Sequence, residues 1–254
     1  MRCTSVVIAD RHPVVLQGLT SVLGAESGFK VVASCSDGTN CIQAIRSGLS
    51  IPRAHLVGSS MGGYAALPFA LRHPEKASAV VAAGTGLGSL PLEYQAWLKR
   101  TAALARAITA RGMKAMASKM AHHQTRIGLK HKDPKGWQEY LSRLEQHSPI
   151  GMANTLVRFQ ALRPSLFEFS DEFSRMAIPV LLSVGDHDAS CLEAALMLKS
   201  LLPNAGLWVA ANTGHSVNVE EPSHFNALED FFSAVERGSR RRVSRRLYYF
   251  RERK

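Results

Sequence analysis

Short apolar runs alternate with segments of helical periodicity along most of this 254-residue chain, and this alternation restricts the fold more than any other feature. Such runs are typical of buried strands. Strands that alternate with helices pair in parallel, because each helix carries the chain back to the same end of the sheet. The sequence therefore predicts an α/β protein with a parallel sheet. The runs span residues 6–9, 29–36, 54–57, 77–86, 178–185 and 206–211.

Helical patterns fill the intervals between these runs. Residues 88–175 differ from the rest, because they contain several helical segments and little strand pattern, and we expect them to form a helical insertion. Within it, Met113, Met116 and Met120 lie at helical spacing, which favours core packing over a flexible apolar pocket. The other predicted helices span residues 13–24, 40–47, about 62–72, 190–201 and 222–236.

Composition excludes several classes of protein. Hydrophobic residues make up 46% and charged residues 20%, which excludes a disordered or collagen-like chain. No uncharged apolar run is long enough for a transmembrane helix, and the opening residues do not form a secretory signal. The cysteines form no CxxC pair, so we expect no structural zinc, no disulfide framework and a reducing, cytoplasmic environment. They are Cys3, Cys35, Cys41 and Cys191.

The formal charge of +11 is concentrated at the C-terminus. Residues 237–254 contain nine Lys or Arg and one Glu, a net charge of +8, so only +3 falls on the rest of the chain. A tail of this kind can bind nucleic acid or anionic lipid. We favour a solvated extension instead, and nucleic acid is not expected as a partner.

One glycine-rich segment joins a predicted strand to a predicted helix. Gly58-Ser59-Ser60-Met61-Gly62 fits the pattern G-x-S-x-G, which forms a nucleophile elbow in this setting. Gly58 and Gly62 permit a tight turn and a close approach of backbones. Ser60 would stand exposed at the end of the strand, where the helix N-terminus favours developing negative charge.

A serine hydroxyl needs a base, and the base needs an acid that orients it. The strand at 178–185 is followed by Asp186 and Asp188, and the strand at 206–211 is followed by His215. The carboxyl ends of parallel strands share one edge of the sheet, so these side chains can meet Ser60 there. Each could have a structural role alone: a turn serine, a helix N-cap or a loop histidine. Together, in the order Ser, Asp, His, they predict a catalytic triad.

Residues from about 51 to 236 resemble the C-terminal two thirds of an α/β-hydrolase fold protein. The segments HLVGSSMGGYAA, PVLLSVGDHD and NTGHSVNVEEPSHFNALEDFF carry this resemblance. It implies that Ser60 is the nucleophile, His215 the general base and Asp188 the acid, with Asp186 as the reserve candidate.

The resemblance implies further parts of a site. The backbone N–H of Met61 would donate to the oxyanion, and the insertion at about 88–175 would be a lid over the substrate pocket. No cofactor is implied. No metal site is expected either, since His122 and His123 lack acids at ligand spacing.

Residues from about 4 to 46 instead resemble the first half of a bacterial response-regulator receiver domain. The receiver's acidic pair is incomplete, because Asp10 is followed by Arg11, and no phosphoacceptor Asp follows in context. Phosphorelay signalling is therefore not expected. No His-Gly pair, the usual source of a second oxyanion donor, precedes Ser60.

The predicted organisation is a receiver-like segment at 1–50, a hydrolase core at 51–236 and a basic tail at 237–254, with a sheet that is N-terminally shortened or hybrid. The predicted function is a serine hydrolase that cleaves small esters or related acyl compounds. Loss of one oxyanion donor costs about 10²–10³ in rate, so weak activity is compatible with this site. The alternatives are a catalytically impaired chimera, with a binding function or none, and a receiver-like signalling fragment. The sequence leaves the oligomeric state open.

Overall fold

The computed structural model describes residues 4–9, 13–25, 29–44 and 53–237. The chain divides into two compact units, Met1–Ala54 and His55–Lys254. The loop Asp10–His12 and residues 238–254 of the basic tail lie outside the described residues, so what the sequence predicts for them stays a prediction.

The first unit contains two parallel strands and two helices, in the predicted β-α-β-α order. Strand β1 pairs in parallel with β2, and the carboxylate of Asp37 caps α2 by accepting the backbone N–H of Asn40 at 2.7 Å. This order opens many parallel-sheet folds, so it does not single out a receiver domain. The elements are β1 (Thr4–Ala9), α1 (Pro13–Ala25), β2 (Phe29–Cys35) and α2 (Gly38–Gln43).

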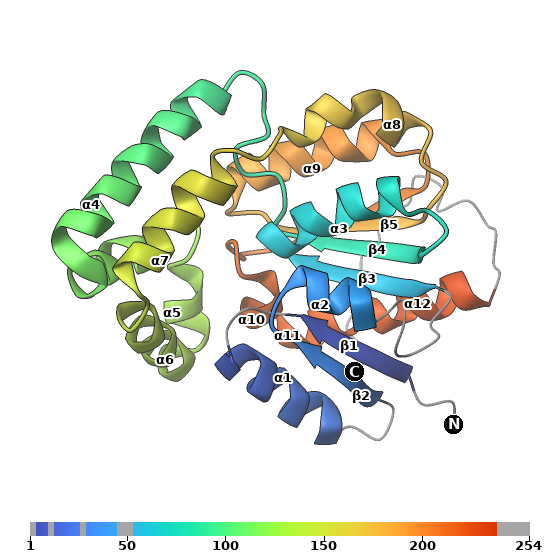
Figure 1. Cartoon of the computed structure of the whole chain (residues 1–254), viewed down its shortest axis with the longest axis horizontal. Helices are drawn as coiled ribbons and strands as arrows, with labels where there is room; N and C mark the ends of the chain where they lie inside the picture. Colours follow the sequence, from blue (N-terminus) through green and yellow to red (C-terminus); the bar gives the residue numbers. More distant parts are fainter. Residues whose placement is uncertain (1–3, 10–12, 26–28, 45–52, 238–254) are drawn as a thin grey trace. The chain divides into compact units, whose positions relative to one another are not determined.

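The second unit is built on a four-stranded sheet with the order β3-β4-β5-β6 (Figure 1). The pairs β4–β5 and β5–β6 are parallel, and all four strands overlap the apolar runs that predict them. A helix follows β3 and another follows β5, as expected for parallel strands. The elements are β3 (Ala54–Ser59), α3 (Met61–Arg72), β4 (Ala77–Ala83), β5 (Val180–Gly185), α9 (Ala189–Leu201) and β6 (Ala205–Ala210).

Helices cover both faces of this sheet. On one face, α3 and α9 bury Leu67 and Leu198 against strand residues such as Val180. On the other, the C-terminal helices pack Leu228 against Trp208. Because β4 and β5 are covered on both sides, their sequences are continuous apolar runs rather than alternating ones.

The predicted helix at 222–236 is wrong in one respect, because it is two helices. They are α11 (Pro222–Asn226) and α12 (Leu228–Glu236), and a further short helix, α10 (Val217–Glu220), precedes them. Ala227 has φ −64° and ψ −4°, which breaks the helical hydrogen bonding there. Alanine is the best helix former, so the sequence carries no sign of this break.

Residues 88–175 form the predicted helical insertion, and no strand interrupts it. It has a core of its own, in which Met113 and Met116 pack with Trp137 and Met120 lies at the edge, so core packing of these methionines is confirmed. None of the described helices is long and apolar enough to cross a membrane. The insertion comprises α4 (Tyr94–Ala121), α5 (Gly128–Lys132), α6 (Pro134–Glu145), α7 (Pro149–Asn154), the π-helix η2 (Thr155–Gln160), the 3₁₀ helix η3 (Leu166–Phe169) and α8 (Ser170–Ser174).

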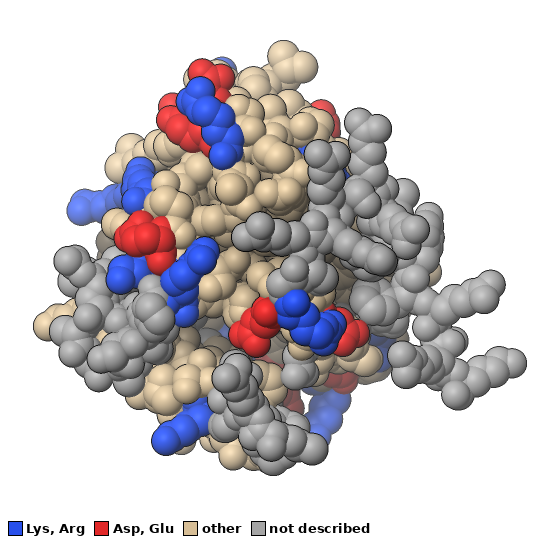
Figure 2. Space-filling view, turned by 90° about the vertical axis from the view of Figure 1, so that its right-hand side faces the viewer, with Lys and Arg blue, Asp and Glu red and all other residues tan. Residues whose placement is uncertain are grey.

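The described residues on the face shown in Figure 2 carry charges of both signs. On the face shown in Figure 2, basic and acidic side chains lie beside one another in small groups. Such a surface is typical of a protein without a large single-sign field on that face.

Candidate active site

Ser60 lies at the turn between β3 and α3, in a backbone conformation that side chains rarely adopt. Its φ is 54° and its ψ is −109°, and its backbone N–H donates to the carbonyl oxygen of Ala83 at 2.7 Å. A positive φ in a residue other than glycine is a strain that persists only where the surroundings impose it. The turn therefore lies where the sequence predicts the elbow, and its strain is typical of such a turn.

The glycines of this turn do not all serve the same purpose. A Cβ on Gly58 would lie 2.2 Å from the backbone of Gly62, and a Cβ on Gly63 would lie 2.0 Å from Oγ1 of Thr85. A Cβ on Gly62 would meet nothing within 4 Å. The close approach thus requires Gly58 and Gly63, whereas the sequence pattern singles out Gly58 and Gly62.

The structure brings the three predicted residues together at the carboxyl edge of the sheet. The Oγ of Ser60 lies 2.9 Å from Nε2 of His215, and Nδ1 of His215 lies 2.6 Å from Oδ2 of Asp188. Asp188 is 3% exposed and His215 is 8% exposed. Since little water reaches this pair, the carboxylate can fix the orientation of the ring.

Asp186, the reserve candidate, has different partners. Its carboxylate accepts the backbone N–H groups of Asn212 and Thr213, each at 3.0 Å. Burial raises the pKa of Asp186, but the hydrogen bonds from Thr213 and Asn212 and the nearby His187 lower it, and the pKa lies below its ordinary value. Asp186 therefore holds the loop after β6, while Asp188 contacts the ring of His215.

The helical insertion also holds the loop that carries His215. The backbone N–H of His215 donates to the carbonyl oxygen of Thr125, at 2.6 Å. The Nζ of Lys132 donates to Oγ1 of Thr213 at 2.9 Å and pairs with Glu221. These contacts join segments about 80 to 90 residues apart, and no pattern in the sequence indicates them.

Glu220 also stabilises the loop that carries His215. It is 5% exposed, and its Oε2 accepts the backbone N–H of Gly214 at 2.9 Å. Sequence analysis missed this residue. The one available signal is that Glu220 lies five residues after His215, within a segment that carries the family resemblance.

Met61 is the first residue of α3. The first N–H groups of a helix have no intrahelical partner, and they point toward the helix N-terminus, beside Ser60. This position fits an oxyanion donor.

One cluster in the described part of the chain has the composition of a metal site, and it overlaps the hydrogen-bonded residues. Ligand atoms of Asp188, Cys191 and His215 lie within 4.8 Å of one another. Burial, and then the nearby Asp188, raise the pKa of the Cys191 thiol well above its usual range. A metal binds the thiolate, so a protonated thiol is a poor ligand. Both ring nitrogens of His215 are also engaged, and the cluster fits acid–base chemistry better than metal binding.

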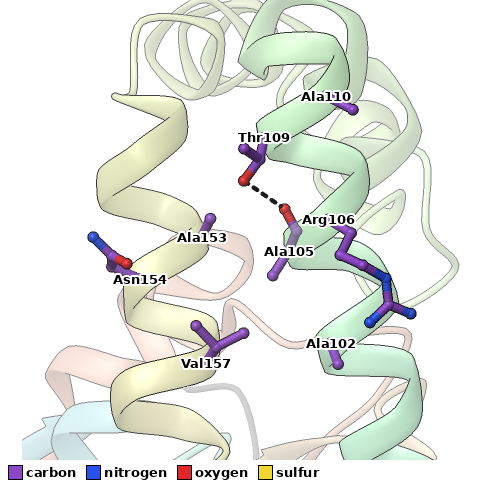
Figure 3. A pocket seen from close by; sticks show the side chains of 8 residues that line it. All are labelled: Ala102, Ala105, Arg106, Thr109, Ala110, Ala153, Asn154 and Val157. Carbon is purple, nitrogen blue, oxygen red and sulfur yellow. Dashed lines mark hydrogen bonds between the residues drawn. The ribbon is translucent and has the colours of Figure 1, made fainter.

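A separate groove of about 410 Å³ lies within the lid, between α4 and α7 (Figure 3). Small side chains line most of it, and neither Ser60 nor His215 contributes to it. Nothing in its lining indicates an occupant. The lining residues are Ala102, Ala105, Arg106, Thr109, Ala110, Ala153, Asn154 and Val157.

Comparison with known proteins identifies relatives of the chain. A family model described as alpha/beta hydrolase fold matches residues 37–222. A 2-hydroxy-6-oxononadienedioate/2-hydroxy-6-oxononatrienedioate hydrolase from Burkholderia vietnamiensis is 30% identical over 189 residues, which cover 71% of this chain and 62% of that protein. A putative 2-succinyl-6-hydroxy-2,4-cyclohexadiene-1-carboxylate synthase from Bacillus subtilis is 28% identical over 194 residues, with coverages of 74% and 68%. The chain thus spans roughly two thirds of the length of these relatives, and slightly less of the first.

The fold is also similar to solved structures. An esterase from Exiguobacterium antarcticum superposes with a TM-score of 0.67 at 18% identity, and the match covers 93% of each chain. At this level of identity the likeness concerns the fold alone.

The glycine contacts predict opposite effects of one substitution at two neighbouring positions. Gly58→Ala should lower the free energy of unfolding by about 1–3 kcal/mol, because the new methyl group collides with backbone. Gly62→Ala should raise it by about 0.5–1 kcal/mol, because alanine is favoured in a helix and the space is open. Urea unfolding of the two variants measures both effects. Equal effects at the two positions would contradict the assignment of the close approach to Gly58.

The hydrogen bonds of Asp186 predict a pH-dependent contribution to stability. The pKa of Asp186 is lower in the folded chain than the value of about 3.9 in the unfolded chain. The carboxylate therefore stabilises the fold above the unfolded pKa, and this stabilisation is lost as the pH falls through the pKa of the folded chain. Asp186→Asn should therefore destabilise the protein at pH 7, and the difference from wild type should shrink below about pH 4. Urea unfolding at pH 7, 5 and 3 measures this. If the difference in the free energy of unfolding between the two proteins stays constant down to pH 3, the charge of Asp186 does not contribute to stability.

Proposed function

Because the chain belongs to the α/β-hydrolase fold family, we propose that it is a serine hydrolase that cleaves small esters or related acyl compounds. One observation carries the proposal. The Oγ of Ser60 contacts Nε2 of His215, whose other ring nitrogen contacts the buried carboxylate of Asp188. This is the arrangement that turns a serine hydroxyl into a nucleophile at neutral pH.

In the first step, Oγ of Ser60 attacks the carbonyl carbon of the acyl group while Nε2 of His215 takes its proton. The imidazolium that forms lies beside Asp188, whose negative charge is little screened because it is buried. The carbonyl oxygen becomes an oxyanion, and the N–H of Met61 at the start of α3 is placed to donate to it.

In the second step, the tetrahedral intermediate collapses and His215 gives its proton to the leaving oxygen. The acyl group is then bonded to Ser60. A water molecule attacks this ester with His215 again as the base, and the acid is released as Ser60 regains its proton. The chain's own residues supply every proton transfer, so the cycle requires no cofactor.

The names of the relatives support the proposal that the substrate is an acyl or carbonyl compound, but they do not identify that compound. One is named for hydrolysis of oxo-dienedioates, and another as a synthase of a cyclohexadiene carboxylate. Since these names describe different reactions on carbonyl compounds, the proposal stays at the level of small esters and related acyl compounds. A reducing, cytoplasmic location also stays a proposal, supported by the free thiols of Cys35, Cys41 and Cys191.

A second candidate is a catalytically impaired protein that acts by binding. It is favoured by the division of the chain after Ala54, the first residue of β3 and six residues before Ser60. The residues that supply early strands and the second oxyanion donor in the family would then be replaced by the receiver-like segment. The receiver-like resemblance itself has no support beyond the sequence.

Hydrolysis of p-nitrophenyl butyrate separates the two candidates. Ser60→Ala should lower kcat by about 10⁴-fold or more, because loss of the nucleophile disables the whole triad. Asp188→Asn should lower it by about 10⁴-fold, and Asp186→Asn, which keeps the ring contact of His215, should lower it far less. Equal, near-background rates for folded wild type and Ser60→Ala would favour the impaired protein. A larger loss of kcat in Asp186→Asn than in Asp188→Asn would show that Asp186 is the acid of the triad.

A further inference from the structure

Arg163 is a partly buried cation held by polar and aromatic groups at the junction of the lid and the core of the second unit. Its Nε donates to Oε1 of Gln160 at 2.9 Å, and its Nη2 donates to the carbonyl oxygen of Leu87 at 2.5 Å. The guanidinium lies 4.2 Å from the ring centre of Tyr64 and 5.5 Å from that of Trp97. Aromatic faces partly compensate for lost hydration of such a cation.

The charge of Arg163 has no acidic partner. The ion pairs among the described residues do not include it. Glu168, five residues further along, instead caps η3 through the backbone N–H of Ser165. The Nη1 atom of Arg163 is buried and has no hydrogen-bond partner. An unpaired charged donor of this kind is costly, so its presence needs an explanation.

Arg163, whose Nη1 donor has no partner, packs on the helix that begins directly after Ser60. Tyr64, over which the guanidinium lies, is one helical turn after Ser60, and its backbone N–H donates to the carbonyl oxygen of Ser60. The carbonyl oxygen of Leu87, which accepts from Nη2 of Arg163, lies in the segment that follows β4, and the last residue of β4, Ala83, accepts the backbone N–H of Ser60. Arg163 therefore contacts α3 one turn after Ser60 and also contacts the segment that follows β4.

We propose that Arg163 binds a carboxylate on the acyl chain of the substrate, so that the preferred esters are monoesters of dicarboxylic acids. This inference rests on the proposed function. A guanidinium offers a planar fork of N–H donors that matches the two oxygens of a carboxylate. Because Nη1 is covered, the adjoining lid residues must move as the ligand enters. The π-helix η2, which ends at Gln160, is the adjoining element, and π-helical turns are frequent at functional sites.

A pair of esters of equal chain length tests the proposal. The p-nitrophenyl monoester of glutaric acid carries a carboxylate where p-nitrophenyl pentanoate carries a methyl group. Wild type should have a higher kcat/KM for the glutarate ester. Arg163→Gln should lower the ratio of the two kcat/KM values by about 10–100-fold, mainly through KM, which is the effect of losing a hydrogen bond to a charged group. Arg163→Lys keeps the positive charge but lacks the planar fork of N–H donors, so its ratio of kcat/KM values should lie between those of wild type and Arg163→Gln.

The control is Arg158→Gln, which removes the same charge from an exposed position of η2 and should leave the ratio unchanged. A wild-type protein without preference for the glutarate ester would overturn the proposal. So would an equal loss on both esters in Arg163→Gln, because that is the result expected if Arg163 only ties the lid to the core.

Calorimetric titration with glutarate separates this proposal from the proposed function, because it requires no turnover. The Ser60→Ala protein should bind glutarate, and adding Arg163→Gln should weaken binding by about tenfold or more. Binding that depends on Arg163 in a protein without Ser60-dependent hydrolysis would reject the hydrolase and retain the carboxylate site. Absence of binding by folded Ser60→Ala would overturn the carboxylate site, whatever the rates with esters.

Discussion

The close contact between the end of β3 and the start of α3 determines where the reactive groups lie. Gly58 approaches the backbone of Gly62 so closely that no side chain fits between them, and the chain reverses within Ser60 at a φ of 54°. The strain costs on the order of 1–3 kcal/mol. It is offset by the burial of α3 against the sheet, through residues such as Leu67. The same packing presents Ser60 to His215, so stability and reactivity depend on one turn.

Much of this could be predicted from the sequence, because the deciding patterns are local. Alternating strand and helix periods fix a parallel sheet, and the ends of parallel strands share an edge. That geometric fact is sufficient to bring Ser60, Asp188 and His215 together from positions far apart in the chain. The packing of Met113 and Met116 in the lid follows from helical spacing in the same way.

The remainder depends on contacts between distant segments, which no local pattern encodes. Asp186 and Asp188 follow the same strand two residues apart, yet one binds the backbone of the next loop and the other binds the ring of His215. The contact of Thr125 with the backbone of His215 arises from how the lid folds back on the core of the second unit. The unpaired donor of Arg163 likewise appears only when burial is known.

The most direct test of the account is whether Ser60 reacts as an activated nucleophile. Intact-mass spectrometry after treatment with a fluorophosphonate measures this, because the reagent phosphonylates serines that a neighbouring base deprotonates. The account predicts one phosphonyl group per chain, located on Ser60 by peptide mapping, absent in Ser60→Ala and strongly slowed in His215→Gln. Folded wild-type protein that stays unlabelled, or that is labelled equally in Ser60→Ala, would contradict it.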